Sequence, residues 1–208
     1  MQFDNKIGSV QQIITATNIG VLRRQAILRE LNLKKNQTII DIGCGGGHLV
    51  EEIAMCVGPS GKAIGVDPSE FQINTAKERC KHLSNVEFLC NPANDIDIEN
   101  NSCDAVTFTQ TLEYIDNVDE ALHAAKRLQK PISNFVNVST LWDFFGFHGP
   151  EKELNNMMHE IYRVQKHPML PTQLNGKLER QGYTNIKTLE MPFFITQKDE
   201  NSFPKYHE

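Results

Sequence analysis

Short apolar runs alternate along this chain with segments in which apolar residues recur every three to four positions. The helical spacing predicts helices over 48–57, 69–81 and 118–128. The apolar runs are typical of strands buried on both faces, and they are QTIIDI (37–42), KAIGV (62–66), VEFLC (86–90), CDAVTFT (103–109) and FVNVS (135–139). Because the connections are long enough for parallel pairing, the pattern predicts an α/β fold, with a mostly parallel sheet and helices on both faces.

The two ends of the chain extend this pattern. Residues 8–31 have helical spacing, and a break is expected between Asn18 and Gly20. After the fifth run, residues 141–165 interrupt the alternation with aromatic residues and a predicted helix over about 151–165. Pro171 is expected to open a further helix that ends at Gly182, and residues 184–191 are predicted to form a sixth strand.

Composition and charge exclude several classes of protein. The chain has 208 residues, of which 39% are hydrophobic and 23% charged, so it is neither disordered nor fibrous. The net charge of −5 and the scattered Lys and Arg residues argue against a nucleic-acid partner. No apolar stretch reaches the roughly 18 residues of a membrane span, and no secretory signal is evident, so a cytoplasmic location is expected. Five cysteines without paired spacing predict reduced thiols and no metal site.

The segment Asp41-Ile42-Gly43-Cys44-Gly45-Gly46-Gly47 joins the first predicted strand to a helix. Such a loop lets a ligand approach the backbone, and the helix N-terminus offers free N–H groups. Asp67 ends the next strand, where a carboxylate can hold ribose hydroxyls. A dinucleotide site needs glycine where His48 stands, and it would place pyrophosphate beside Asp41. S-adenosylmethionine, with its ammonium group and ribose, fits both acids and the loop.

At these residues the sequence resembles the class I S-adenosylmethionine-dependent methyltransferases, over roughly residues 20–195. TIIDIGCGGG is similar to their first motif, and GVDPSE is similar to their second. Residues 91–122 resemble the loop after the third strand, the fourth strand and the segment that follows. Within this family, the nearest likeness is to small-molecule methyltransferases of the ubiquinone and menaquinone biosynthesis type.

The resemblance implies a Rossmann-like fold with S-adenosylmethionine as cofactor. Asp41 would face the ammonium group, and Asp67 would take both ribose hydroxyls. The family often has Gly-Asp-Ala where this chain has Asn91-Pro92-Ala93, so an acceptor for the adenine amino group is missing at Pro92. The full set of implied cofactor-binding residues is Asp41, Gly43, Cys44, Gly45, Gly47, Asp67, Pro68, Ala93, Asn94 and Gln110.

The acceptor pocket is expected at the carboxyl ends of the fourth and fifth strands, where open α/β sheets bind ligands. His148 is the candidate general base, needed only if the acceptor loses a proton, and Glu113 is a second catalytic candidate. A packing role for His148 and a structural role for Glu113 stay open. Candidate substrate-binding residues are Tyr114, Trp142, Phe147 and Tyr162, and aromatic walls suit a planar or apolar acceptor.

The implied function is methyl transfer from S-adenosylmethionine to a small-molecule acceptor. One alternative is a catalytically weak or inactive methyltransferase-like module that binds a partner protein, which Pro92 favours. A nicotinamide-dependent oxidoreductase is the third hypothesis, and His48 and Asp41 disfavour it. We expect a single domain with four parts: a helical region (1–34), a cofactor-binding core (35–140), a helical acceptor or lid region (141–182), and a C-terminal strand and tail (183–208).

Family members usually end with a sixth strand and an antiparallel seventh. Here the run PFFIT at 192–196 is a short apolar remnant, and the polar segment after it contains Pro204. The seventh strand is therefore expected to be shortened or missing. Because an unpaired strand edge recruits partners, we predict a weak homodimer, or a partner protein, that covers residues 184–197.

Overall fold

The computed structural model describes residues 15–144, 152–153, 156 and 165–191. Its sheet has five parallel strands in the order β3-β2-β1-β4-β5. The strands are β1 (Thr38–Ile42), β2 (Lys62–Val66), β3 (Val86–Leu89), β4 (Cys103–Thr109) and β5 (Gln129–Val138). The helices are α2 (Asn18–Leu31), α3 (His48–Val57), α4 (Glu70–Arg79), α5 (Val118–Leu128) and α7 (Leu170–Arg180), with short 3-10 helices η1 (Leu112–Tyr114) and η2 (Trp142–Phe144).

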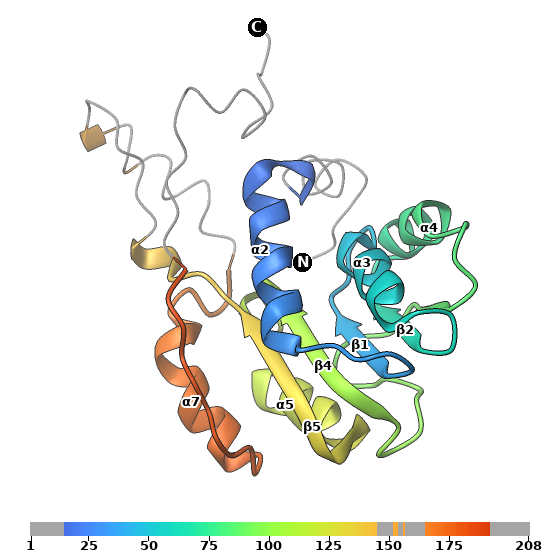
Figure 1. The fold of residues 1–208 in the computed structure, drawn as a ribbon. Helices are drawn as coiled ribbons and strands as arrows, with labels where there is room; N and C mark the ends of the chain where they lie inside the picture. Colours follow the sequence, from blue (N-terminus) through green and yellow to red (C-terminus); the bar gives the residue numbers. More distant parts are fainter. Residues whose placement is uncertain (1–14, 145–151, 154–155, 157–164, 192–208) are drawn as a thin grey trace, which may run out of the picture.

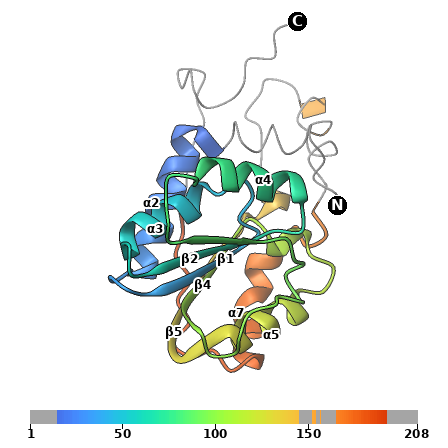
Figure 2. The same cartoon turned by 90° about the vertical axis from the view of Figure 1, so that its right-hand side faces the viewer.

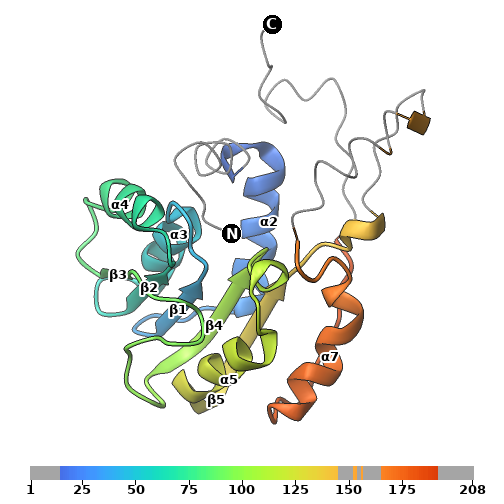
Figure 3. The same cartoon turned by 180° about the vertical axis from the view of Figure 1, so that it is seen from behind.

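Helices cover both faces of the sheet, as predicted (Figure 2). Successive strand residues point to opposite faces, so neighbouring isoleucines of β1 enter different cores. Ile39 joins a cluster with α2 and α3, to which Ile73 of α4 also belongs. Ile40 joins a second cluster with α5 and α7, the two helices nearest the viewer in Figure 3. The apolar runs of the sequence are therefore buried on both sides. Because helices cover both faces of the sheet, the connecting loops lie at the ends of the strands.

Local capping explains where the helices begin. The Thr17 side chain accepts from the Gly20 N–H and starts α2 at Asn18, so the helical pattern is interrupted at Thr17, one residue before the break expected between Asn18 and Gly20. Ser69 accepts from the Gln72 N–H and starts α4. These caps satisfy N–H groups that have no partner within the helix.

β5 begins at Gln129, six positions before the predicted start of this strand at residue 135. The register shifts between Cys103 and Ala105 of β4, which is how the pairing accommodates the extra residues of β5. Pro131 lies inside the strand and has no N–H to donate, a position that edge strands tolerate. Within the described residues, β5 pairs with β4 alone and forms an edge of the sheet.

The prediction of a sixth strand over 184–191 is wrong. The structure assigns no strand there, and the segment after Gly182 passes beside α7 in Figure 1. Asn185 has a left-handed φ of 57°, which a strand does not adopt, and Thr188 exchanges hydrogen bonds with Asn175 of α7. The hydrogen bonds between Thr188 and Asn175 therefore outweigh the alternation of apolar residues over 184–191 that predicted a strand. The run at 192–196 lies outside the described residues.

No helix in the described part of the chain combines the length and the apolar character that a membrane crossing requires.

Candidate functional site

The loop from β1 to α3 has a backbone that favours glycine. Gly43, Gly45 and Gly47 have φ values of 78°, 51° and 80°, in the left-handed region. A Cβ atom on Gly43 would lie 2.2 Å from Oγ1 of Thr111, and one on Gly47 would lie 2.8 Å from Cβ of Ala76. The loop is therefore pressed against the segment after β4 on one side and against α4 on the other.

Asp67 closes this loop from the end of β2. Its carboxylate accepts the Gly45 N–H at 3.0 Å and the Ser69 N–H at 2.9 Å. Burial raises the pKa of Asp67, and these two hydrogen bonds oppose the rise. Each carboxylate oxygen has a further lone pair, so Asp67 can hold the loop and still accept from two hydroxyl groups.

Asp41 is a buried acid whose side chain is incompletely satisfied. It lies in β1 between Gly65 of β2 and Thr107 of β4, and its side chain is 2% exposed. Burial raises its pKa to about 7, and the nearby charge of Asp67 adds to the rise. Its Oδ1 atom has no hydrogen-bond partner among the described residues. Since an unpaired buried carboxylate is costly, this atom fits a ligand that brings a donor or a positive charge.

Cys44 lies in the same loop, but its thiol belongs to the core. It is buried in the cluster that contains Ile39 and Leu49, and burial raises its pKa well above the usual value. The thiol therefore stays protonated, and the part of Cys44 suited to a ligand is its backbone.

Gln110 follows β4 directly and adopts an unusual backbone conformation. Its φ is 48°, and its N–H donates to the Val138 carbonyl of β5 at 2.7 Å. The Gln110 amide donates through Nε2 to Oγ1 of Thr140 and accepts through Oε1 from Nη1 of Arg23 at 2.8 Å. The amide is thus fixed between β5 and α2, at the carboxyl ends of the strands.

Glu113, three residues after Gln110, is fully buried. Its carboxylate accepts from Oγ of Ser139 at 3.2 Å and from the Thr140 N–H at 3.3 Å. Burial raises the Glu113 pKa, and these bonds together with one from the Trp142 side chain oppose the rise. The Glu113 carbonyl accepts the N–H groups of Lys166 and His167. Glu113 therefore ties η1 to the end of β5 and to the segment before α7, whereas its catalytic role stays a prediction.

Two of the four predicted substrate-binding residues are described, and both lie beside Glu113. Tyr114 is half-buried, and burial raises its pKa while a hydrogen bond from the Gln165 side chain lowers it. Trp142 opens η2 and donates its backbone N–H to the Pro168 carbonyl. His148, Phe147 and Tyr162 fall outside the described residues, and so does the predicted helix over 151–165 apart from positions 152, 153, 156 and 165.

A family model described as a methyltransferase domain matches residues 33–190. The chain belongs to this methyltransferase family. A demethylmenaquinone methyltransferase of Staphylococcus carnosus is 31% identical over 108 residues, which are 52% of this chain and 45% of that protein. An uncharacterised 37.1 kDa protein of a Streptomyces fradiae transposon is 25% identical over 82% of this chain and 50% of its own length. The chain thus spans about half the length of these curated relatives.

Solved structures show the same fold. The crystal structure of a SAM-dependent methyltransferase from Aquifex aeolicus matches with a TM-score of 0.66 and 23% identity, covering 84% of this chain and 86% of that one. The parallel sheet, the glycine loop and the helices on both faces are therefore those of the class I methyltransferase fold, as the sequence predicted.

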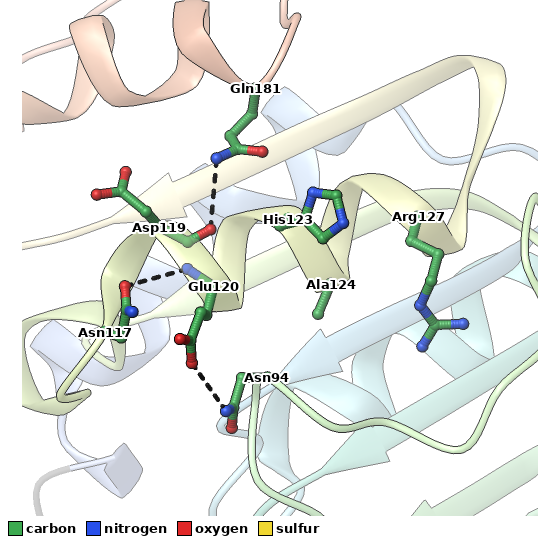
Figure 4. A pocket seen from close by; sticks show the side chains of 8 residues that line it. All are labelled: Asn94, Asn117, Asp119, Glu120, His123, Ala124, Arg127 and Gln181. Atoms are coloured by element: carbon green, nitrogen blue, oxygen red, sulfur yellow. Dashed lines mark hydrogen bonds between the residues drawn. The ribbon is translucent and has the colours of Figure 1, made fainter.

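In this methyltransferase fold, the loop after β3 contributes less clearly to the site than the sequence implied. Asn94 is exposed, and Ala93 is partly buried against the core. Pro68, another predicted cofactor contact, lies in the loop after β2 and is also exposed. The Asn94 side chain donates to Oε2 of Glu120 at 3.1 Å and lines a surface groove on α5 (Figure 4). The Ala93 backbone and the Asn94 side chain stay predictions as adenine contacts.

Arg23 is the site residue that the sequence did not single out. Its position in the helical pattern of α2 is an ordinary polar one, and nothing local marks it. It reaches the site because α2 packs along β5 on the face shared with α3. A helical wheel alone carries no information about which strand end a helix crosses.

Proposed function

We propose that the protein transfers a methyl group from S-adenosylmethionine to a small-molecule acceptor. The single observation that carries this proposal is the unpartnered, buried Oδ1 of Asp41 next to the glycine loop. The ammonium group of the cofactor would pair with this carboxylate, and Asp67 would accept from the ribose hydroxyls. When bound, the cofactor supplies a methyl group already activated by its sulfonium.

The acceptor would lie against the segments after β4 and β5. Tyr114 and Trp142 would supply an aromatic wall there, and the Trp142 side chain is hydrogen-bonded to Glu113. Phe144 and Leu141 lie next to this wall in the chain, and their side chains are 76% and 38% exposed. An apolar rim with few polar groups is typical of sites for small apolar or planar ligands. The relative named as a demethylmenaquinone methyltransferase supports an acceptor of that shape.

The residues of the chain would act mainly by alignment. An activated methyl group needs a nucleophile held in line, and proximity alone supplies much of the rate enhancement. His148 would serve as general base only for an acceptor that must lose its proton at the site. We further propose a cytoplasmic location, consistent with reduced thiols.

Binding and turnover test separate parts of this proposal. Calorimetry should show S-adenosylhomocysteine binding to the wild type and much weaker binding to Asp41→Asn, while the exposed Asp97→Asn variant serves as the matched control. Turnover is tested by mass spectrometry of metabolite fractions incubated with S-adenosylmethionine, in which one compound should gain a methyl group. Binding without any turnover would favour the partner-binding module instead, and tight NADH binding would overturn the cofactor assignment.

A further inference from the structure

Arg23 extends from α2 toward the carboxyl ends of β4 and β5. The first part of α2 reaches past these strand ends in Figures 1 and 3. Arg23 lies in the N-terminal half of this helix. Its Nη1 donates to Oε1 of Gln110 at 2.8 Å. Because Gln110 also donates to Thr140 and is held at a left-handed φ, its oxygen is fixed toward α2. Gln110 therefore orients the guanidinium of Arg23 over the site.

The neighbouring Arg24 has a structural role in α2 and serves as a comparison for Arg23. Arg24 is buried, forms an ion pair with Glu52 of α3 at 2.8 Å and donates to the Thr15 carbonyl at 2.6 Å. Arg23 has no ion pair with a carboxylate in the described part of the chain. Among the described residues, the guanidinium of Arg23 donates to the neutral side-chain amide of Gln110. A guanidinium has five N–H donors, so further donors remain for a ligand.

Charge around Arg23 points to the acceptor side of the site. Burial lowers the pKa of Arg23, and the nearby Glu113 carboxylate and Tyr114 oppose this. The Glu113 carboxylate accepts from Ser139 and Thr140, and no ion pair between it and Arg23 is present among the described residues. A half-buried guanidinium that lacks a carboxylate partner is suited to an anion that arrives with a ligand.

We propose that Arg23, oriented by Gln110, binds an anionic oxygen of the ligand between the methionine end of the cofactor and the acceptor wall. The proposal rests on the proposed methyl transfer and names its substrate class: an acceptor with an ionised hydroxyl or a carboxylate. The carboxylate of the cofactor is a second source of the same chemistry. An amine acceptor is disfavoured, since its positive charge would face a guanidinium.

An anionic acceptor changes what the site has to do. A nearby positive charge favours the ionised form of a hydroxyl group. The ionised oxygen uses its lone pair to form the new C–O bond, and the electrons of the broken C–S bond return to sulfur as a neutral thioether. No proton has to leave during the step, so such an acceptor needs no general base.

The test compares Arg23→Gln with Arg29→Gln, an exposed arginine on the same helix that pairs with Glu30. Calorimetry measures S-adenosylhomocysteine and its decarboxylated analogue, and NMR titration measures benzoate and neutral benzamide on the cofactor-bound protein. We expect Arg23→Gln to weaken benzoate binding about tenfold or more, the size of effect expected for one charged hydrogen bond, and to leave benzamide unchanged. Arg29→Gln should match the wild type.

The other results are equally decisive. If Arg23→Gln weakens S-adenosylhomocysteine but not its decarboxylated analogue, the anion subsite stands and the cofactor supplies the anion. If all four ligands bind both proteins equally, the proposal is overturned. Failure of the wild type to bind S-adenosylhomocysteine would refute the proposed function instead. Should Arg23→Gln unfold, Gln110→Glu provides a second arm, because it pairs Arg23 internally and should weaken the same anion.

Discussion

The Asp67 carboxylate accepts a hydrogen bond of 3.0 Å from the Gly45 N–H, so this side chain shapes the glycine loop. Its remaining lone pairs can accept from the ribose hydroxyls of a ligand. The two roles are separable. Holding the loop uses one lone pair of Oδ2, and burial makes the loss of that bond expensive, because the Gly45 donor would then lose its partner.

Asp67→Ala should weaken S-adenosylhomocysteine binding and loosen the loop before any ligand is present. Hydrogen bonds to a charged partner are worth about 1.5–3 kcal/mol, so the affinity should fall by roughly one to two orders of magnitude. Calorimetry measures the affinity, and hydrogen exchange of the Gly45 amide measures the loop. The exposed Asp97→Ala is the control, and unchanged affinity in Asp67→Ala would refute the ribose role.

Asp41 should make both stability and binding depend on pH near neutrality. Its pKa is raised to about 7 in the folded protein, so its stabilising contribution is present below the unfolded pKa. That contribution is lost as the pH rises from about 4 through 7, because the folded state then holds a proton that the unfolded state has released. Urea titrations of the ligand-free protein at several pH values should show this decline.

Binding should have the opposite dependence on pH, because an ammonium group needs the ionised Asp41. The affinity for S-adenosylhomocysteine should rise between about pH 6 and pH 8 and be accompanied by proton release, which calorimetry in buffers of different ionisation enthalpy detects. His48 does not contribute to this change, since burial, Arg79 and Arg24 lower its pKa to about 4. Asp41→Asn should abolish both trends, and retention of the trends would assign them to another group.

Gly43→Ala should be strongly destabilising. The new methyl group would collide with Thr111, whose hydroxyl is held by the Thr109 carbonyl, and the left-handed φ adds strain of order 1–3 kcal/mol. Urea unfolding measures the loss, and Thr111→Ala in the same chain should restore part of it by removing the nearest atoms. Gly176→Ala in α7, where only the end of Arg180 is near, should be neutral or stabilising by about 0.4–1 kcal/mol.

The sequence predicted the parts of the fold that depend on local patterns. The β1, β2 and β4 strands have the expected bounds, apart from one residue at the start of β1, and Ser69 caps α4 as expected. Apolar runs and caps are local signals, so residues a few positions apart suffice to read them. Asn185 shows the opposite case, since its left-handed backbone ends a pattern that otherwise alternates like a strand.

The site was predictable only where a motif carries it. Asp41, Asp67 and the glycines follow from strand ends and loop chemistry, and the structure brings them together. The contact between Arg23 and Gln110 joins residues 87 positions apart, and the tie from Glu113 to Ser139 joins residues 26 apart. Such contacts depend on how α2 and β5 pack, which no local spacing encodes.

The sequence placed the edge of the predicted homodimer at residues 184–197, but no strand forms over 184–191 and the edge lies at β5, on which we now base the proposal of a weak homodimer. Within the described residues β5 pairs only with β4, and Ile132 in this strand is 96% exposed. Two copies of one strand edge can pair antiparallel about a two-fold axis, whereas Pro131 lacks the N–H that pairing near it requires. The contact should therefore be short and weak.

Sedimentation velocity over a concentration series should show reversible dimerisation of the wild type. Ile132→Lys should abolish it by placing like charges across the axis, and Leu22→Lys, at an exposed apolar site on α2, should not. A wild type that sediments as a monomer throughout the series would show that this edge recruits no second copy.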